Sequence, residues 1–137
     1  MTGSLKLADV GSVVAQRTFP ALEREDLRRY AQASGDLNPL HLDPAFARRA
    51  GFDDVIVHGM LGMALLGRLV SEAFPTESLL NFRSRFRSVI PIGKAIVCEA
   101  TLTASDGRVA DLALAAAAEG GPVAIEAAAR LLLGGAS

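Results

Sequence analysis

The chain has only two histidines, His41 and His58, and both lie in a turn-rich region outside the periodic segments. Asp36 precedes His41 by five residues, with the dipeptide Asn38-Pro39 between them. A loop that tightens at Asn-Pro can bring a carboxylate and an imidazole to face one small space. Such a pair can hold a water molecule, one group taking its proton while the other gives a proton elsewhere. The spacing therefore indicates acid/base chemistry at Asp36 and His41.

A second feature is Gly59, which follows His58 and opens the longest apolar run of the sequence. If that run is a helix, its N-terminus offers unpaired N–H groups and the positive end of the helix dipole. Glycine at this point lets a ligand come close to the backbone. A carbonyl oxygen that gains negative charge would be stabilised there, as in an oxyanion hole.

The same residues also have explanations without chemistry. Asp36 could serve only as a turn or N-cap carboxylate, and His41 could bind a backbone carbonyl. A metal site built from Asp36, His41, Asp43 and His58 has suitable ligand types, but no short ligand pair on one helix face supports it. We therefore predict no metal.

Hydrophobic periodicity predicts the helices that must position these residues. A helix is expected from Leu22 to Ala33, with Gly35 in the left-handed position that follows a helix. A short helical turn is expected from Pro44 to Ala50, with Asp43 as its N-cap. The run from Gly59 to Phe74 is apolar almost all round, which is typical of a helix that other elements surround.

Strands account for most of the remaining chain, and the predicted ranges are 13–19, 81–90, 96–103, 109–118 and 123–133. Asp106-Gly107 is a strong hairpin signal. The alanines at 115–118 and 127–129 prefer helix by propensity. We still favour strands, because small and apolar residues alternate with Glu126 and Arg130 there, and hairpin-linked segments suit one antiparallel sheet. The predicted fold class is α+β: a single domain over 1–137, with an antiparallel sheet around one long helix.

Composition limits the function further. The 137 residues suffice for one domain, half of them are hydrophobic, and the net charge is −1, which argues against a nucleic-acid partner. The lone Cys98 lies in an alternating run, as a small core residue would. The apolar stretch Met60–Val70 is too short for a membrane span, and the N-terminus has no signal-peptide pattern. We therefore expect a cytoplasmic protein without a membrane span.

The segment from Tyr30 to Ala47 resembles the signature of the MaoC-like (R)-specific enoyl-thioester hydratases and dehydratases. In that signature an aromatic residue precedes Ser-Gly-Asp-x-Asn-Pro-aliphatic-His, and a small residue follows; the matching string here is Ser34 to His41. The segment Ile56–Leu61 is similar to the second block of the family. Ala33 and Gly67 depart from the pattern, in places where larger aliphatic residues and a serine occur.

The resemblance implies a hot-dog fold, a homodimer, no cofactor, and reversible hydration of trans-2-enoyl-CoA to (R)-3-hydroxyacyl-CoA. Asp36 and His41 would hold the water; we favour Asp36 as base and His41 as acid, with the reverse assignment open. The N–H of Gly59 would bind the thioester oxygen, and Asn38 would hold the loop. Arg85 would meet the phosphates of coenzyme A or of a carrier-protein arm, although the arginines at 83, 85 and 87 also fit a solvated strand face.

Other activities remain open at this point. The nearest alternative is a (3R)-hydroxyacyl dehydratase subunit that acts on acyl carrier protein, possibly within a heterodimer. More distant alternatives are a hot-dog thioesterase and a non-catalytic acyl-binding subunit.

Overall fold

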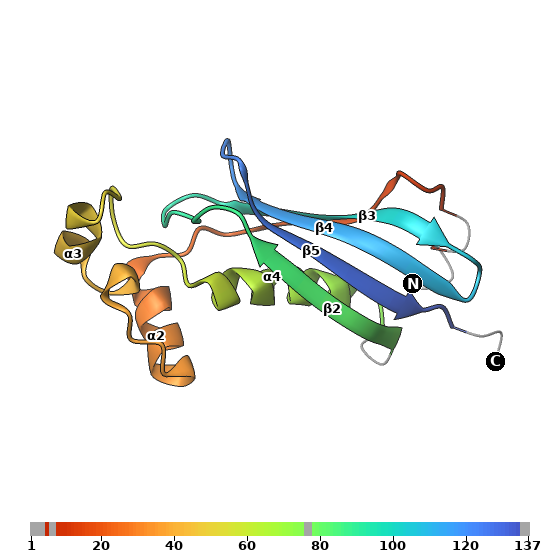
Figure 1. Cartoon of the computed structure of the whole chain (residues 1–137), viewed down its shortest axis with the longest axis horizontal. Helices are drawn as coiled ribbons and strands as arrows, with labels where there is room; N and C mark the ends of the chain where they lie inside the picture. The colour runs from red at the N-terminus through yellow and green to blue at the C-terminus, as the bar shows by residue number, and fades with distance from the viewer. Residues whose placement is uncertain (1–4, 6–7, 76–77, 135–137) are drawn as a thin grey trace.

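One long helix packed on a five-stranded antiparallel sheet forms the core of the computed structural model, which describes residues 5, 8–75 and 78–134 (Figure 1). In chain order the elements are β1 Val13–Phe19, α2 Arg24–Ser34, the short 3₁₀ turn η1 Pro39–His41, α3 Pro44–Arg49, α4 Gly59–Ala73, β2 Leu79–Phe86, β3 Ile96–Ser105, β4 Val109–Ala118 and β5 Val123–Leu132.

The strands lie in the order β1-β3-β4-β5-β2, and every neighbouring pair is antiparallel. The β3–β4 hairpin turns at the predicted Asp106-Gly107. There the Asp106 carboxylate accepts hydrogen bonds from the N–H groups of Arg108 and Val109, both at 2.8 Å, and Gly107 has a φ of 87°. The alanine-rich segments are strands β4 and β5, as their alternation predicts.

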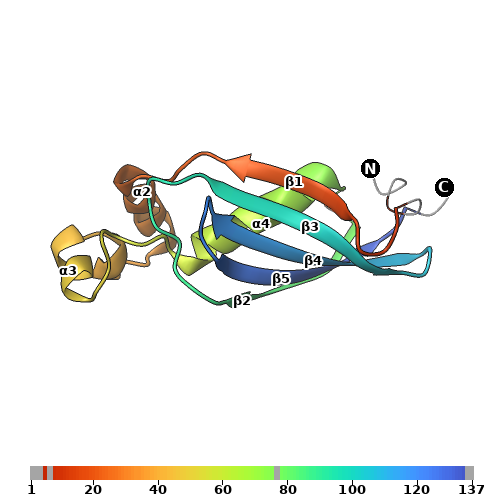
Figure 2. The same ribbon diagram turned by 90° about the horizontal axis from the view of Figure 1, so that it is seen from above.

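Helix α4 packs on one face of the sheet, against β1, β3, β4 and β5 (Figure 2). Its residues Leu66, Leu69 and Val70 are buried, as are the inward-facing Leu112 and Leu114 of β4. Helices α2 and α3 lie beyond one end of the sheet, next to the start of α4 (Figure 1). The arrangement confirms the expected hot-dog fold.

The helices end close to where the sequence places them. Helix α2 begins at Arg24 because Glu23 and Asp26 form a capping box, and it ends at Gly35, whose φ is 81°. The Asp43 carboxylate caps α3 by accepting from the N–H groups of Ala45 and Phe46 at 3.0 and 3.2 Å.

The largest difference from the predicted elements is in β2, which ends at Phe86 rather than at Ile90. The N–H groups of Arg87 and Ser88 both donate to the Ala124 carbonyl, at 2.8 and 3.2 Å, which closes the ladder. The Ile90 carbonyl instead accepts from the N–H of Val57, so this part of the chain is tied to the segment that enters α4.

The structure also bears on the expectations for Cys98 and for a membrane span. Cys98 is completely buried, and burial raises the pKa of its thiol to about 11, so it is a core residue and not a nucleophile. In the part of the chain that the structure describes, no helix has the length and apolar character needed to cross a membrane.

The close approach of α4 to the sheet predicts different outcomes at two of its glycines. A Cβ at Gly62 would lie 2.6 Å from Ile125 Cδ1 and 3.2 Å from Ile90 Cδ1, whereas a Cβ at Gly67 meets nothing within 4 Å. Gly67→Ala should raise the free energy of unfolding by about 0.5–1 kcal/mol through helix propensity. Gly62→Ala should not show this gain, and Gly62→Leu should lower stability by about 1–3 kcal/mol through overpacking.

Chemical denaturation of the three variants measures these changes. Equal stability changes for alanine at positions 62 and 67 would contradict the packing of α4 described above.

Candidate active site

Short-range hydrogen bonds give the segment between α2 and α3 a fixed shape. The N–H of Asp36 donates to Ser34 Oγ at 3.1 Å, and the Asp36 carboxylate accepts from the N–H of Asn38 at 3.3 Å. Asn38 Oδ1 in turn accepts from the N–H of Leu40 at 3.0 Å, which caps η1. These Asx-type and Ser-type turns hold Asp36 and His41 on one side of the loop.

A hydrogen bond to the chain that leads into α4 orients His41. Its Nδ1 lies 2.7 Å from the carbonyl oxygen of Ile56, and the N–H of Ile56 donates to the Leu40 carbonyl at 3.1 Å. A carbonyl oxygen only accepts, so Nδ1 carries a hydrogen. Proton exchange is therefore left to Nε2 of the half-buried His41 ring.

His58 lies directly behind His41. The two rings are stacked, with centroids 3.9 Å apart and planes at 24°, and the Tyr30 ring meets His58 edge-on at 4.8 Å. His58 Nε2 lies 3.3 Å from the carbonyl oxygen of Asp36. The side chain is 1% exposed, and burial, followed by the nearby His41, lowers the pKa of His58.

The side chains of Asp36, His41 and His58 form one cluster, in which one possible ligand atom from each lies within 4.8 Å of the others. An ion lies in the ring plane of an imidazole that binds it. Two rings stacked at 3.9 Å and 24° do not share such a point at bonding distance. The Asp43 carboxylate is engaged at α3. We therefore treat the cluster as an acid/base group, and the absence of a metal stays a prediction.

Gly59 lies beside this cluster, as the first residue of α4. At that position the N–H has no acceptor within the helix. A Cβ on Gly59 would lie 3.2 Å from the Phe86 ring, which covers this end of the helix. Phe86 is not among the site residues predicted from the sequence. The one sequence signal that could indicate its inward position is the alternation of β2, since Phe82 and Phe86 share the face opposite the arginines.

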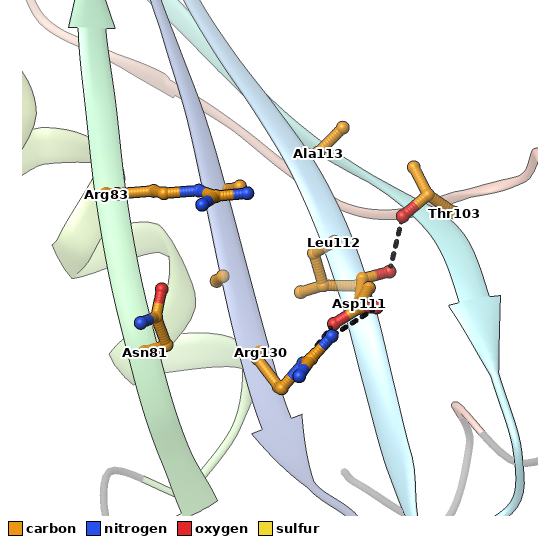
Figure 3. Close-up of a pocket in the computed structure, with 9 residues that line it drawn as sticks. Asn81, Arg83, Thr103, Asp111, Leu112, Ala113 and Arg130 are labelled. Carbon is orange, nitrogen blue, oxygen red and sulfur yellow. Dashed lines mark hydrogen bonds and ion pairs between the residues drawn. The ribbon is translucent and has the colours of Figure 1, made fainter.

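The structure thus brings together four of the five predicted site residues: Asp36, Asn38, His41 and Gly59. Arg85 lies elsewhere: it stands opposite Glu126 in the β2–β5 register and lines an outer hollow of about 450 Å³ with Arg83. Next to it, a hollow of about 360 Å³ is lined by residues of β2, β3, β4 and β5, and there Arg130 donates to the Asp111 carboxylate (Figure 3). Ser84, which lies between Arg83 and Arg85 in β2, points toward α4 and contacts Met63.

Known proteins resemble this chain in sequence and in fold. The family described as MaoC like domain matches residues 7–117. The chain is 41% identical over 95 residues to the mitochondrial 3-hydroxyacyl-[acyl-carrier-protein] dehydratase of Arabidopsis thaliana, a match that covers 69% of this chain and 55% of that protein. It is 33% identical over 104 residues to the (R)-specific enoyl-CoA hydratase of Aeromonas caviae, covering 73% and 78%.

The solved structure of an (R)-hydratase from A. caviae has a TM-score of 0.77 and 31% identity to this chain. That match covers 93% of this chain and 98% of the other. The chain spans little more than half the length of the plant dehydratases that it matches.

The buried His58 predicts a pH dependence of stability. Because the pKa of His58 is lowered from its ordinary value of 6.5, the unfolded chain takes up this proton at a higher pH than the folded chain. The free energy of unfolding should therefore decrease as the pH falls below about 6.5, and His58→Phe should lack this contribution. Thermal unfolding of both proteins at about pH 7.5 and about pH 5.5 measures it. An equal loss in both would show that His58 does not resist protonation.

Proposed function

Because the chain belongs to the family of MaoC-like domains, we propose that it reversibly hydrates trans-2-enoyl-CoA to (R)-3-hydroxyacyl-CoA. The main support is the Asp36–His41–His58 cluster beside the first N–H of α4. One carboxylate oxygen and one ring nitrogen from each histidine lie within 4.8 Å of one another there. The similarity to the (R)-specific enoyl-CoA hydratase of A. caviae supports the substrate and the stereochemistry.

In the proposed reaction, a water molecule is held between the Asp36 carboxylate and His41 Nε2. Asp36 takes one proton as the water oxygen bonds to C3, and the electron pair of the double bond moves toward C2. In this assignment His41 is an imidazolium with hydrogens on both Nδ1 and Nε2, and it gives the Nε2 proton to C2 on the same face of the double bond, which leaves a neutral ring with its hydrogen on Nδ1. Transfer of the proton from Asp36 to His41 restores the starting state. In the reverse assignment a neutral His41 takes the water proton at Nε2, and a protonated Asp36 gives its proton to C2.

Charge that develops on the thioester oxygen needs a donor. We assign this role to the N–H of Gly59, because it is unpaired within α4 and lies at the positive end of the helix dipole. A single donor of this type contributes about 3 kcal/mol to the stability of the transition state. Phe86 and Met63 supply apolar surface for the acyl chain.

Asn38 supports both groups by holding the loop between them. Arg85 would contact the phosphates of coenzyme A only where the ligand passes the sheet edge formed by β2, because its side chain lies on the outer face.

The proposed working unit is a homodimer. Strand β2 is an edge strand of the sheet, and a long edge strand with exposed apolar side chains is a natural pairing surface. Leu79, Leu80 and Phe86 of this strand are 37%, 53% and 50% exposed, and Met60 at the start of α4 is 58% exposed. No cofactor is part of the proposal, and a cytoplasmic location stays a prediction.

A second candidate is dehydration of 3-hydroxyacyl groups on acyl carrier protein, the same chemistry in the opposite direction. The 41% identity to the plant mitochondrial dehydratase favours it. Rates measured on matched CoA and carrier-protein thioesters separate the two. Release of free thiol would instead indicate a thioesterase, and binding without turnover would indicate an acyl-binding subunit.

Removing either proton-transfer group should abolish most activity without unfolding the chain. Asp36→Asn keeps an oxygen to accept from the N–H of Asn38, and His41→Gln keeps an amide that can donate to Ile56. Each should lower the hydration rate of crotonyl-CoA by about 10²- to 10⁴-fold. The control is Asp43→Asn, the same substitution at a carboxylate that only caps α3, and it should retain the wild-type rate. Near wild-type turnover in Asp36→Asn or His41→Gln would refute the assignment.

A side chain at position 59 should obstruct the thioester oxygen. Gly59→Val places methyl groups between the helix N-terminus and Phe86, so kcat/KM for crotonyl-CoA should fall at least about tenfold. Gly67→Ala, on the same helix in open space, serves as the control. An unchanged kcat/KM in Gly59→Val would rule out the Gly59 N–H as the oxyanion donor.

A further inference from the structure

We propose that His58 is a positioning residue of the candidate active site, which holds Asp36 through a hydrogen bond to its backbone carbonyl and holds His41 through ring stacking. The inference rests on the proposed function, because it assigns to His58 the alignment of the two groups that exchange protons. It goes beyond that function in naming a third side chain, buried behind the reacting pair, on which the rate should depend.

The hydrogen bonds of His58 select one tautomer. Its Nε2 faces the Asp36 carbonyl oxygen at 3.3 Å, and only a ring nitrogen that carries hydrogen can donate to that oxygen. Its Nδ1 is buried and has no hydrogen-bond partner among the residues that the structure describes. A proton on Nδ1 would therefore leave a buried N–H group unpaired, at a cost of about 1–3 kcal/mol. His58 is thus neutral, with its hydrogen on Nε2.

The contacts of His41 show what this neutral ring contributes. The hydrogen bond from His41 Nδ1 to the Ile56 carbonyl fixes one edge of the imidazole, but it leaves rotation about that bond open. Stacking on His58, at 3.9 Å and 24°, fixes the plane of the ring. The Tyr30 ring meets His58 edge-on and holds it from behind. The two constraints together aim His41 Nε2 in one direction.

His58 also links the three groups that act on the substrate. It directly precedes Gly59, so the backbone that carries the proposed oxyanion donor is the backbone that carries the stacked ring. Its hydrogen bond to the Asp36 carbonyl connects this backbone to the loop that carries the carboxylate. One buried ring therefore sets the carboxylate, the imidazole and the helix N-terminus relative to one another.

Direct participation of His58 in proton transfer does not fit its surroundings. The side chain is 1% exposed and is covered by His41 on one side and by Tyr30 on another. Burial and the neighbouring His41 both lower the pKa of His58, which keeps this ring neutral. Because His58 is enclosed in this way, we assign the exchangeable proton to the half-buried His41.

Two substitutions separate the two contacts. His58→Phe keeps an aromatic ring for stacking but cannot donate to the Asp36 carbonyl. His58→Gln can donate to that carbonyl but cannot stack. Because a misplacement of about 1 Å costs about 10²-fold in rate, each variant should lower kcat for crotonyl-CoA hydration about 10- to 100-fold. KM should stay nearly constant, since the lost alignment acts on the transition state.

A purely structural role would change stability and leave kcat per folded molecule at the wild-type value. Cys98→Ala, a truncation in the buried core on β3, three strands across the sheet from β2, is the control for such a role and should melt earlier while retaining kcat. Wild-type kcat in both folded His58 variants, after correction for the folded fraction, would overturn the proposal.

A second measurement does not depend on activity. Long-range ¹⁵N–¹H correlation spectra of the wild-type chain report the tautomer and charge of each histidine. We expect His58 to be neutral at pH 7 with its hydrogen on Nε2, and to take up a proton only below its ordinary pKa of 6.5. A hydrogen on Nδ1, or protonation of His58 above that pH, would overturn the proposal. If the wild-type chain hydrates no enoyl thioester, the proposed function fails, and these spectra still decide whether His58 holds the arrangement described here.

Discussion

Burial of α4 against one face of the sheet is the constraint on which the rest of the structure depends. Leu66, Leu69 and Val70 are withdrawn from water only when the helix lies close to the sheet, and Gly62 allows that approach. Once the helix is fixed, its N-terminus at Gly59 is fixed too. Asp36 and His41 lie on a loop that hydrogen-bonds to the segment just before Gly59. His41 Nδ1 binds the Ile56 carbonyl, and the Asp36 carbonyl binds His58 Nε2.

The two faces of the sheet differ in chemical character. The inner face packs against α4 and places Phe86 beside the start of the helix, so the candidate site combines apolar surface from the sheet with one backbone N–H from the helix. The outer face carries exposed ion pairs such as Arg130–Asp111 and Arg87–Glu126, which contribute little to stability because water screens them. Charge within the candidate site is therefore limited to the reacting pair, and the buried histidine beside it stays neutral.

Much of this could be predicted from the sequence because local rules and the overall fold agree. Gly35, Asp43 and Asp106-Gly107 each specify a cap or turn that the structure contains. Alternation also outweighed the helix propensity of the alanines in β4 and β5, since inward positions on a sheet need small side chains where a helix lies close. The Asp36–His41 pair followed from the Asn-Pro turn between the two residues.

Long-range contacts account for what the sequence did not reveal. The end of β2 at Phe86 depends on the Ala124 carbonyl, which is distant in sequence. Alternation separated Arg85 from Phe86, but only the packing of α4 decides which of these faces lies toward the site. The stacking of His58 on His41 joins residues 17 positions apart through a loop whose path no periodicity describes.

We propose that this chain adds water across the double bond of an enoyl thioester. The most direct test is to incubate the purified wild-type chain with crotonyl-CoA and to determine the amount and configuration of the 3-hydroxybutyryl-CoA formed. We predict consumption of crotonyl-CoA until an equilibrium mixture is reached, in which the only 3-hydroxybutyryl-CoA is the (R)-product. Formation of the (S)-product, release of free coenzyme A, or no consumption of crotonyl-CoA would contradict it.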